Sequence, residues 1–162
     1  MKRFFGALIM IIAFTATSSF AQRNWSGNRM FNAGLGFANK GVPVYAGVEF
    51  GVHPDITVGG EISYLSYRHN NHRNNIFGFQ GLANYHFGRI LNMSSEWDFY
   101  AGANLGFNVY NKAANEDNNY SNLSLGLQIG GRYYFNNNLA LNLELLGGNN
   151  IYGGRIGISY MF

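Results

Sequence analysis

Apolar side chains alternate with polar residues or glycine along most of this chain, and this period of two constrains the fold most. In residues 97–109 one set of alternate positions is apolar throughout: Trp97, Phe99, Ala101, Ala103, Leu105, Phe107 and Val109. The intervening positions are polar or glycine, and residues 123–135 repeat the pattern. Successive side chains of a β-strand point to opposite faces, so both runs predict strands with one apolar face.

The same alternation predicts a chain of antiparallel strands in up-and-down order. Eight strands are expected, near residues 30–38, 42–52, 56–68, 76–87, 97–110, 122–135, 139–147 and 154–162. Gly, Asn or Pro-Asp predict tight turns at 39–41, 53–55 and 136–138. Longer, polar, Asn-rich loops are expected at 68–75 and 111–121. No helical pattern or linker is evident, which indicates one all-β domain.

The face opposite the apolar one consists mostly of glycine and neutral polar residues. Its glycines include Gly34, Gly36, Gly47, Gly51, Gly59, Gly102, Gly106, Gly126, Gly130 and Gly157. In a soluble sandwich or barrel this face would lie in water and would be rich in Lys, Glu and Thr. Small residues instead suit a cramped interior, and the apolar face suits lipid, where backbone polar groups must all be paired. The sequence therefore predicts a closed, monomeric, eight-stranded transmembrane β-barrel.

The placement of aromatic residues supports a membrane-spanning barrel. If the first strand starts in the periplasm, one end of the barrel collects Phe31, Phe50, Tyr85, Phe87, Trp97, Phe99, Tyr133, Phe135, Tyr160 and Phe162. The other end collects Phe37, Tyr64, Phe77, Phe79 and Phe107. Two aromatic girdles flanking an aliphatic band are typical of such barrels. In this orientation the turns at 53–55 and 136–138 are periplasmic, and the loops at 68–75 and 111–121 are extracellular.

The first residues have the features of a cleavable signal peptide. Lys2 and Arg3 precede an uncharged apolar run over residues 4–14, and Ser19-Phe20-Ala21 is a small-x-small cleavage site. An uncleaved anchor is less favoured, because a spanning helix needs about 20 apolar residues. We therefore expect a leader over residues 1–21 and an exported barrel domain over residues 22–162.

Charge and cysteine content exclude several classes of protein. Without Lys2 and Arg3, nine of the 11 basic residues remain against eight acidic ones, so a near-neutral chain gives no electrostatic case for binding nucleic acid. The sequence has no cysteine, which excludes disulfide scaffolds, Cys-based metal sites and a lipid-modified N-terminal Cys.

The C-terminal strand carries a recognisable motif. Polar Arg155 is followed by Gly157 and then by alternating aromatic residues, Tyr160 and Phe162, and this resembles the C-terminal signal of outer-membrane barrels. The resemblance implies that the barrel-assembly machinery reads the last strand.

The mature chain as a whole resembles small eight-stranded barrels of the outer membrane protein A and X type. The similar segments are 47–64 and 130–145, in each of which a tight polar turn joins two alternating strands. Among such barrels, the chain resembles in particular the "outer membrane protein beta-barrel domain" proteins common in Bacteroidota. The resemblance implies an outer-membrane location. Unlike full-length outer membrane protein A, the sequence ends at Phe162, so we do not expect a peptidoglycan-binding domain.

Five charged residues are expected to face the interior of the barrel. They are Glu49, Glu61, Arg132, Glu144 and Arg155. Because buried charges must be paired, we expect an ion-pair cluster that plugs the lumen, in which Glu144 pairs with Arg155 and Arg132 and closure brings Arg155 near Glu49. One carboxylate is left to find a hydrogen bond, water or a proton. The cluster either only stabilises the barrel or forms part of a gated conduction path.

The predicted loop at 68–75 concentrates basic side chains. Arg68, His69, His72 and Arg73 could together contact the phosphates of lipopolysaccharide. A metal site is less favoured, because the loop offers no carboxylate or third ligand. His53 and His86 fall near the periplasmic end and are expected at the membrane interface.

A lipid-modifying enzyme would need a Ser–His–acid constellation near one membrane face. The candidates near the outer end are Ser63, Ser66, His69 and His72. The nearest acids, Glu116 and Asp117, lie in an Asn-rich loop, and no nucleophile elbow, P-loop or dinucleotide fingerprint occurs. Catalysis and a cofactor are therefore not expected.

The predicted function is that of a non-enzymatic outer-membrane barrel with a plugged interior. It would act as a structural or adhesive protein, or as an accessory subunit of a larger outer-membrane complex. A small-solute channel resembling a porin is the alternative, and a lipid-modifying enzyme is the third hypothesis. The expected partners are outer-membrane lipid and lipopolysaccharide.

Overall fold

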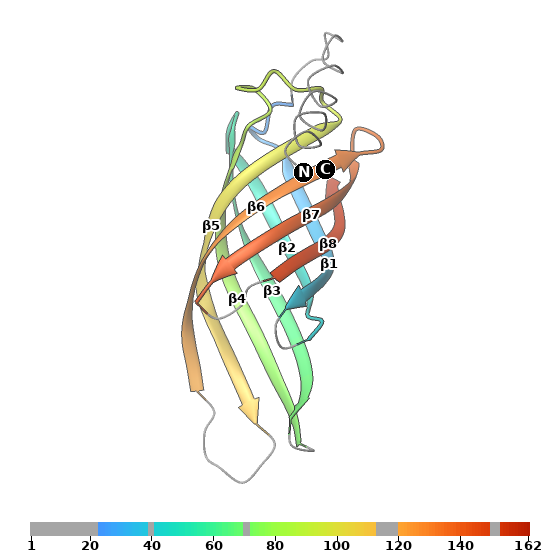
Figure 1. The fold of residues 1–162 in the computed structure, drawn as a ribbon. Helices are drawn as coiled ribbons and strands as arrows, with labels where there is room; N and C mark the ends of the chain where they lie inside the picture. The colour runs from blue at the N-terminus through green and yellow to red at the C-terminus, as the bar shows by residue number, and fades with distance from the viewer. Residues whose placement is uncertain (1–22, 39–40, 70–71, 113–119, 150–152) are drawn as a thin grey trace, which may run out of the picture.

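The computed structural model describes residues 23–38, 41–69, 72–112, 120–149 and 153–162, which form one closed antiparallel β-barrel (Figure 1). The strands are β1 (Arg29–Ala38), β2 (Val44–His53), β3 (Ile56–His69), β4 (His72–His86), β5 (Trp97–Lys112), β6 (Tyr120–Tyr134), β7 (Leu139–Gly148) and β8 (Gly153–Met161). This confirms the predicted eight-stranded fold. The expected leader over residues 1–21 lies outside the described residues.

Pairing of the first and last strands closes the barrel. Each strand pairs with its neighbour in the chain, and β1 pairs with β8 from Met30↔Met161 to Ala38↔Gly153. Closure removes the two free sheet edges, whose unpaired backbone groups could not persist in hydrocarbon. Among the described residues, no helix is long and apolar enough to cross a bilayer.

The prediction of a loop at 68–75 is wrong. β3 continues to His69 and β4 begins at His72, with Arg68 opposite Arg73 and His69 opposite His72. Every residue from 68 to 75 is polar in the sequence, so the alternation that marks a membrane strand disappears while the backbone ladder continues. β5 likewise continues to Lys112, and β6 begins at Tyr120. The rest of the loop predicted at 111–121 lies outside the described residues.

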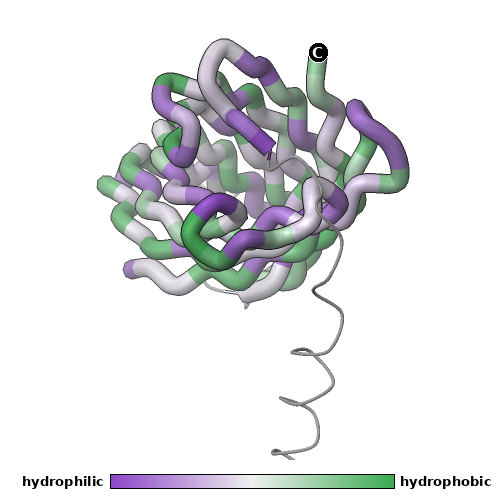
Figure 2. The backbone as a smooth tube through the Cα atoms, turned by 90° about the horizontal axis from the view of Figure 1, so that it is seen from above, coloured by the Kyte–Doolittle hydropathy of each residue, from purple (hydrophilic) through white to green (hydrophobic). Residues whose placement is uncertain are grey.

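Apolar side chains cover the outside of the barrel and polar ones fill the inside. Along β6, Leu123, Leu125, Leu127 and Ile129 are exposed, whereas Ser124, Gln128 and Arg132 are buried. Figure 2 shows the same alternation as short green and purple or white stretches along the tube. This is the reverse of a soluble protein and is the arrangement expected when the outer wall faces lipid.

The two ends of the barrel differ in their connections. The C-terminus, which directly follows β8, lies at the end of the barrel that carries the turns at 53–55 and 136–138 (Figure 1). Outward aromatic residues gather there in contact pairs such as Trp97 with Tyr133 (centroids 4.8 Å apart), and the opposite end carries pairs such as Phe79 with Phe107 (5.5 Å). Short turns are typical of the periplasmic side of membrane barrels, so this end is named the periplasmic end, as the sequence predicts, and the opposite one the extracellular end.

Close approach of neighbouring strands explains glycines on the inward face. A Cβ on inward Gly106 of β5 would collide with the carbonyl oxygen of Phe79 on β4. Outward Gly81 of β4 differs, because the nearest atom to its Cβ would be the Leu105 oxygen at 3.7 Å, an ordinary contact. The inward glycine is thus required by the tight wall, and the outward one is not.

We expect Gly106→Ala to lower the free energy of unfolding by about 1–3 kcal/mol, because the methyl group forces two strands apart. The matched change Gly81→Ala should stay within about 0.5 kcal/mol of the parent chain. Urea unfolding in lipid vesicles, followed by tryptophan fluorescence, measures both. Equal effects of the two substitutions would contradict the assigned inward and outward faces.

Candidate functional site

The centre of the periplasmic half of the lumen is an ionic network around Arg132 of β6. Its guanidinium group binds Glu49 of β2 (Nη2 to Oε1, 2.5 Å) and Asp98 of β5 (Nη1 to Oδ2, 3.1 Å). The side chain of Arg132 is 1% exposed and both carboxylates are 3% exposed. The guanidinium carbon also lies 4.1 Å from the centre of the Tyr100 ring. The contact with Glu49 joins β6 to the distant strand β2 across the lumen, whereas Asp98 is directly opposite Arg132 on the neighbouring strand β5.

Neutral donors complete the coordination of Glu49. Its carboxylate accepts hydrogen bonds from Asn32 Nδ2 (2.8 Å), Thr57 Oγ1 (2.5 Å) and Asn84 Nδ2 (3.0 Å). A buried carboxylate is tolerated when it is both ion-paired and hydrogen-bonded, and Glu49 meets both conditions.

His86 of β4 extends this network, and the prediction that it is interfacial is wrong. It is 2% exposed, its Nδ1 lies 2.8 Å from Asp98 Oδ1, and its ring stacks on Trp25 with centroids 4.1 Å apart. The reason is that β4 keeps its ladder as far as His86, opposite Tyr100, so the inward row of the strand includes this residue.

Thr57, His86 and Asp98 lie in the order of a hydrolase triad. Thr57 Oγ1 is 3.1 Å from His86 Nε2, and His86 contacts Asp98 on its other side. The Thr57 hydroxyl is 2.5 Å from Glu49 Oε2, however, and the three residues are at most 2% exposed. In this arrangement the hydroxyl is buried and already hydrogen-bonded to Glu49, which leaves it inaccessible to a substrate.

A second ionic group lies around Arg155 of β8. Its Nη1 is 2.6 Å from Glu61 Oε2 on β3 and 3.6 Å from Glu144 Oε2 on β7. Tyr100 donates a hydrogen bond of 2.5 Å to the other oxygen of Glu144. The Arg155 guanidinium lies 4.8 Å from the Tyr45 ring centre.

The five charged residues expected inside therefore form two groups rather than one. The expected pair of Glu144 with Arg155 is present, but Arg132 contacts Glu49 and Asp98 instead of Glu144, and Arg155 contacts Glu61 instead of Glu49. Arg132 is opposite Asn142 in the ladder, and Glu144 is two residues further along β7. Long arginine side chains reach across the narrow lumen to non-neighbouring strands, which adjacency in the barrel does not reveal.

Amide side chains fill the space beside the ionic groups. Gln128 donates to Asn84 (2.7 Å) and accepts from Asn104 (3.1 Å). On the opposite wall, Tyr45, Asn142, Ser159 and Asn32 form a continuous chain of hydrogen bonds that ends at Glu49. Hydrogen bonds between side chains thus link most of the strands through the lumen.

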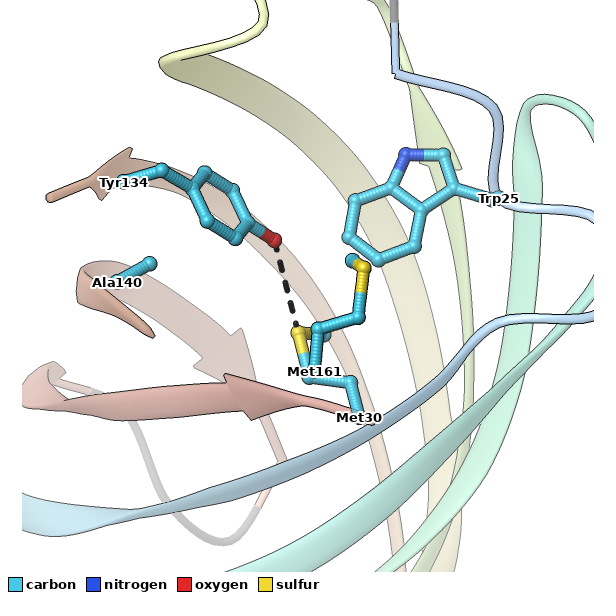
Figure 3. Packing of buried hydrophobic residues seen from close by; sticks show 5 residues of the cluster. All are labelled: Trp25, Met30, Tyr134, Ala140 and Met161. Atoms are coloured by element: carbon cyan, nitrogen blue, oxygen red, sulfur yellow. Dashed lines mark hydrogen bonds between the residues drawn. The ribbon is translucent and has the colours of Figure 1, made fainter. Parts of the chain in front are cut away.

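An apolar layer closes the periplasmic end. It consists of Trp25, Met30, Tyr134, Ala140 and Met161, and Tyr134 donates a weak hydrogen bond to the Met30 sulfur at 3.8 Å (Figure 3). Trp25 comes from the segment before β1 and points into the mouth, where its backbone N–H donates to the Pro54 oxygen (3.2 Å).

Arg23 fixes the same segment over the mouth. Its guanidinium carbon lies 3.6 Å from the Tyr134 ring centre, and its nitrogens donate to the carbonyl oxygens of Ser95 (3.1 Å) and Asn137 (3.2 Å). The N-terminal segment is therefore held by two separate periplasmic turns.

A smaller apolar cluster lies inside the extracellular half. Leu65 of β3, Ile76 of β4 and Tyr110 of β5 are buried together, with Tyr67 packed against them. The lumen is thus apolar near both ends and ionic in the middle.

The other predicted site residues lie on the wall or at its ends. Gly157 is buried, whereas Tyr160 and Phe162 are exposed on the outer face, and the Phe162 N–H donates to the Arg29 oxygen. Arg68 is exposed near the tip of the β3–β4 hairpin. Glu116 and Asp117 lie outside the described residues. No three His, Cys, Asp or Glu residues within the described ranges could together hold a metal ion.

Sequence reasoning missed Trp25, Asp98 and His86 as parts of the network. Asp98 was identifiable in principle, because it occupies the polar face of the 97–109 run. Trp25 lies before the first strand, and no periodicity marks a residue that folds back into the mouth.

A comparison with family models decides the class of the protein. Residues 11–148 match the model described as "Outer membrane protein beta-barrel domain". The chain belongs to this outer-membrane β-barrel family. No curated protein matches the sequence.

Solved outer-membrane barrels have the same fold as this family member. OprG from Pseudomonas aeruginosa superposes with a TM-score of 0.64 at 10% identity, covering 86% of this chain and 97% of that one. The N-terminal barrel domain of Pseudomonas aeruginosa OprF gives 0.55 at 18%, covering 85% and 98%. Ail, the attachment invasion locus protein of Yersinia pestis, in complex with the heparin analogue sucrose octasulfate, gives 0.55 at 12%, covering 85% and 99%.

Membership of this family places the protein in the outer membrane, in agreement with the apolar outer wall of its barrel. The localisation predicted from the sequence is confirmed. At these identities the solved structures show the common fold, and they assign no ligand or activity to this chain.

We expect Arg132→Met to lower the free energy of unfolding by about 3–5 kcal/mol, because it leaves Glu49 and Asp98 buried without their cation. The control Arg89→Met breaks a 3.4 Å ion pair with Asp55 at the rim, where the arginine side chain is 46% exposed and that of Asp55 13%, and should cost less, about 1 kcal/mol. Urea titration in vesicles compares the two. If the network around Arg132 had no structural importance, both substitutions would lower the free energy of unfolding by a similar amount.

Proposed function

We propose that the protein is a non-enzymatic outer-membrane barrel with an occluded lumen, which acts as a structural or adhesive protein or as an accessory subunit of a larger outer-membrane complex. The observation that carries this proposal is the position of Arg132, which is fully buried and binds Glu49 of β2 across the lumen as well as Asp98 of the neighbouring strand β5. A side chain held in this way occupies the path that a solute would take.

The dimensions of the barrel support occlusion. An eight-stranded barrel has an interior just wide enough for side chains to fill. Here an apolar layer around Trp25, an ionic layer around Arg132, a second ionic layer around Arg155 and an apolar cluster around Leu65 succeed one another. To open a continuous aqueous path, several paired charges would have to separate from their partners at once.

The alternative of a small-solute channel has one observation in its favour. Within the part of the chain that the structure describes, some buried polar atoms have no hydrogen-bond partner, among them Glu61 Oε1 and both amide atoms of Asn108. Buried polar atoms in this position commonly bind water. Isolated waters are compatible with an occluded lumen, whereas a channel requires a continuous file of them.

The geometry also argues against a lipid-modifying enzyme. The contact chain of Thr57, His86 and Asp98 is sealed inside the barrel beneath Trp25, far from any lipid substrate on the outer wall. Because the interior is closed, only the surface can contact other molecules. The loops, turns and outer wall are therefore the regions through which the protein interacts with its surroundings.

Planar-bilayer recording tests the occlusion. The purified, folded protein should give no large, steady single-channel currents, because the charged layers exclude a continuous water column. A trimeric porin inserted in the same bilayers serves as the positive control. Steady unitary currents that persist in homogeneous preparations would contradict the proposal.

Site-specific photo-crosslinking in intact cells tests the proposed accessory role. A probe at Leu127, which is 70% exposed on the outer wall, should capture one partner of constant mass if the barrel is an accessory subunit. The control probe at Gln128 is on the buried face of the same strand and should capture none. Absence of any partner at Leu127 would exclude a stable neighbour at that wall and leave the autonomous structural or adhesive role.

A further inference from the structure

The ring of His86 has a polar partner at each of its two nitrogens. Nε2 lies 3.1 Å from Thr57 Oγ1, and Nδ1 lies 2.8 Å from Asp98 Oδ1. A neutral imidazole has one N–H donor and one bare nitrogen that can only accept, whereas an imidazolium ion has two donors. The hydrogen bonds made by the two partner atoms therefore determine how many hydrogens the ring carries.

The partner of Nε2 can only accept a hydrogen bond. The hydroxyl group of Thr57 has a single hydrogen, which it donates to Glu49 Oε2 (2.5 Å). Glu49 is an ionised acceptor, because donors from Arg132 and Asn84 also point at its two oxygens. Only the lone pairs of the Thr57 oxygen are left for His86, so Nε2 must carry a hydrogen.

The partner of Nδ1 is an acceptor as well. Asp98 binds His86 through Oδ1, and its Oδ2 accepts a hydrogen bond from Arg132 Nη1 (3.1 Å). A guanidinium group at this distance favours the ionised form of a carboxyl group, and a carboxylate has no hydrogen to donate. Nδ1 must therefore carry the second hydrogen, which makes the His86 ring an imidazolium ion.

The charges of the ionic layer around Arg132 lead to the same conclusion. The layer holds two carboxylates, those of Glu49 and Asp98, and one guanidinium group, and all three side chains are at most 3% exposed. With a neutral His86 the layer would keep one negative charge without a balancing cation, which is costly away from water. A cation at His86 makes the layer electrically neutral.

The other titratable groups around the ring have partners of their own. Tyr100, whose ring centre lies 5.5 Å away, donates its hydroxyl hydrogen to Glu144. Asp55 and Arg89 border the small cavity beside the ring and pair with each other at 3.4 Å. Arg23 borders the same cavity and donates to backbone carbonyl oxygens of two turns. The charge of the layer is thus balanced by its own four groups.

Trp25 lies directly on the charged ring. Its indole stacks on His86 with ring centroids 4.1 Å apart and an interplanar angle of 27°, and the Arg132 guanidinium carbon lies 5.6 Å from the Trp25 ring centre. The faces of aromatic rings attract cations, and indole does so most strongly. Trp25 therefore covers two cations, and its 2% exposure shows that both contacts are shielded from water.

We propose that His86 binds a second proton and that the resulting imidazolium ion holds Trp25, and with it the segment 23–28, over the periplasmic mouth. The ligand of this site is a proton, and the acceptor atoms of Thr57 and Asp98 are the groups that select the doubly protonated ring. Loss of the proton would remove one hydrogen bond and the charge beneath Trp25 together. Closure of the mouth is thereby coupled to protonation, whatever role the barrel has in the membrane.

Nitrogen NMR of the histidine ring tests for the proton directly. The sequence contains four histidines, so a chain with His53→Gln, His69→Gln and His72→Gln leaves His86 as the only histidine signal. In lipid nanodiscs at about pH 7.5, where a free histidine is mostly neutral, both ring nitrogens of His86 should show a bonded hydrogen. One protonated and one bare nitrogen would identify a neutral ring and would overturn the proposal.

Quenching of Trp25 fluorescence by acrylamide tests what the charge does. The sequence has two tryptophans, so Trp97→Phe leaves Trp25 as the only reporter. In that background, His86→Phe keeps a flat ring beneath Trp25 but removes the charge and both donors. We expect the quenching constant to rise at least about 3-fold, because the cation that attracts the indole is gone. An unchanged constant would mean that ring stacking alone holds Trp25, which contradicts the proposal.

Two matched variants control for the substitution itself. Thr57→Ser keeps the hydroxyl acceptor, so both ring nitrogens of His86 should stay protonated. His53→Phe makes the same exchange at a histidine of the same end whose side chain is 57% exposed, and it should leave the quenching constant within about 2-fold. An equal rise for His53→Phe and His86→Phe would overturn the proposal. The NMR measurement leaves His86 in place, so it decides the question even if His86→Phe does not fold.

Discussion

The pairing of backbone hydrogen bonds is the constraint on which the rest of this structure depends. Hydrocarbon offers no partner to an unpaired N–H or C=O group, so strands that cross a membrane must form a closed ring. Here the ring closes where β1 pairs with β8. Closure in turn fixes which side of every strand faces lipid. It thereby explains why so many large apolar side chains are exposed on the outer wall of the folded barrel.

Closure with eight strands makes the lumen narrow. The narrow lumen in turn determines which side chains can lie inside and how their charges are paired. Strands approach so closely that an inward residue such as Gly106 cannot carry a side chain. The larger inward residues must then share little space, and their charges are distant from bulk water. Arg132 and Arg155 each bind carboxylates of two other strands, so the ionic groups hold together strands that are not neighbours in the barrel. Stability and occlusion of the lumen thus have the same physical origin.

The sequence predicts the architecture well because lipid imposes a strict period of two on each spanning strand. Where the chain leaves the bilayer this signal ends, and the β3–β4 hairpin, wrongly predicted as a loop, shows the consequence. The partners of buried charges are harder to predict. Arg155 reaches Glu61 across the lumen, and that contact depends on strand stagger rather than on strand order. Trp25 is a residue outside the repeating pattern, and only the three-dimensional structure places it over His86.

Cysteine-scanning spin labels along β6 test the central claim of an apolar outer wall and an enclosed polar face most directly. The sequence contains no cysteine, so single substitutions can be introduced without background. In lipid bilayers, labels at Leu125, Leu127 and Ile129 should collide readily with lipid-soluble oxygen and not with a water-soluble nickel chelate. Labels at Ser124 and Gln128 should be shielded from oxygen. A period of two with the opposite phase, or no periodicity at all, would contradict the account.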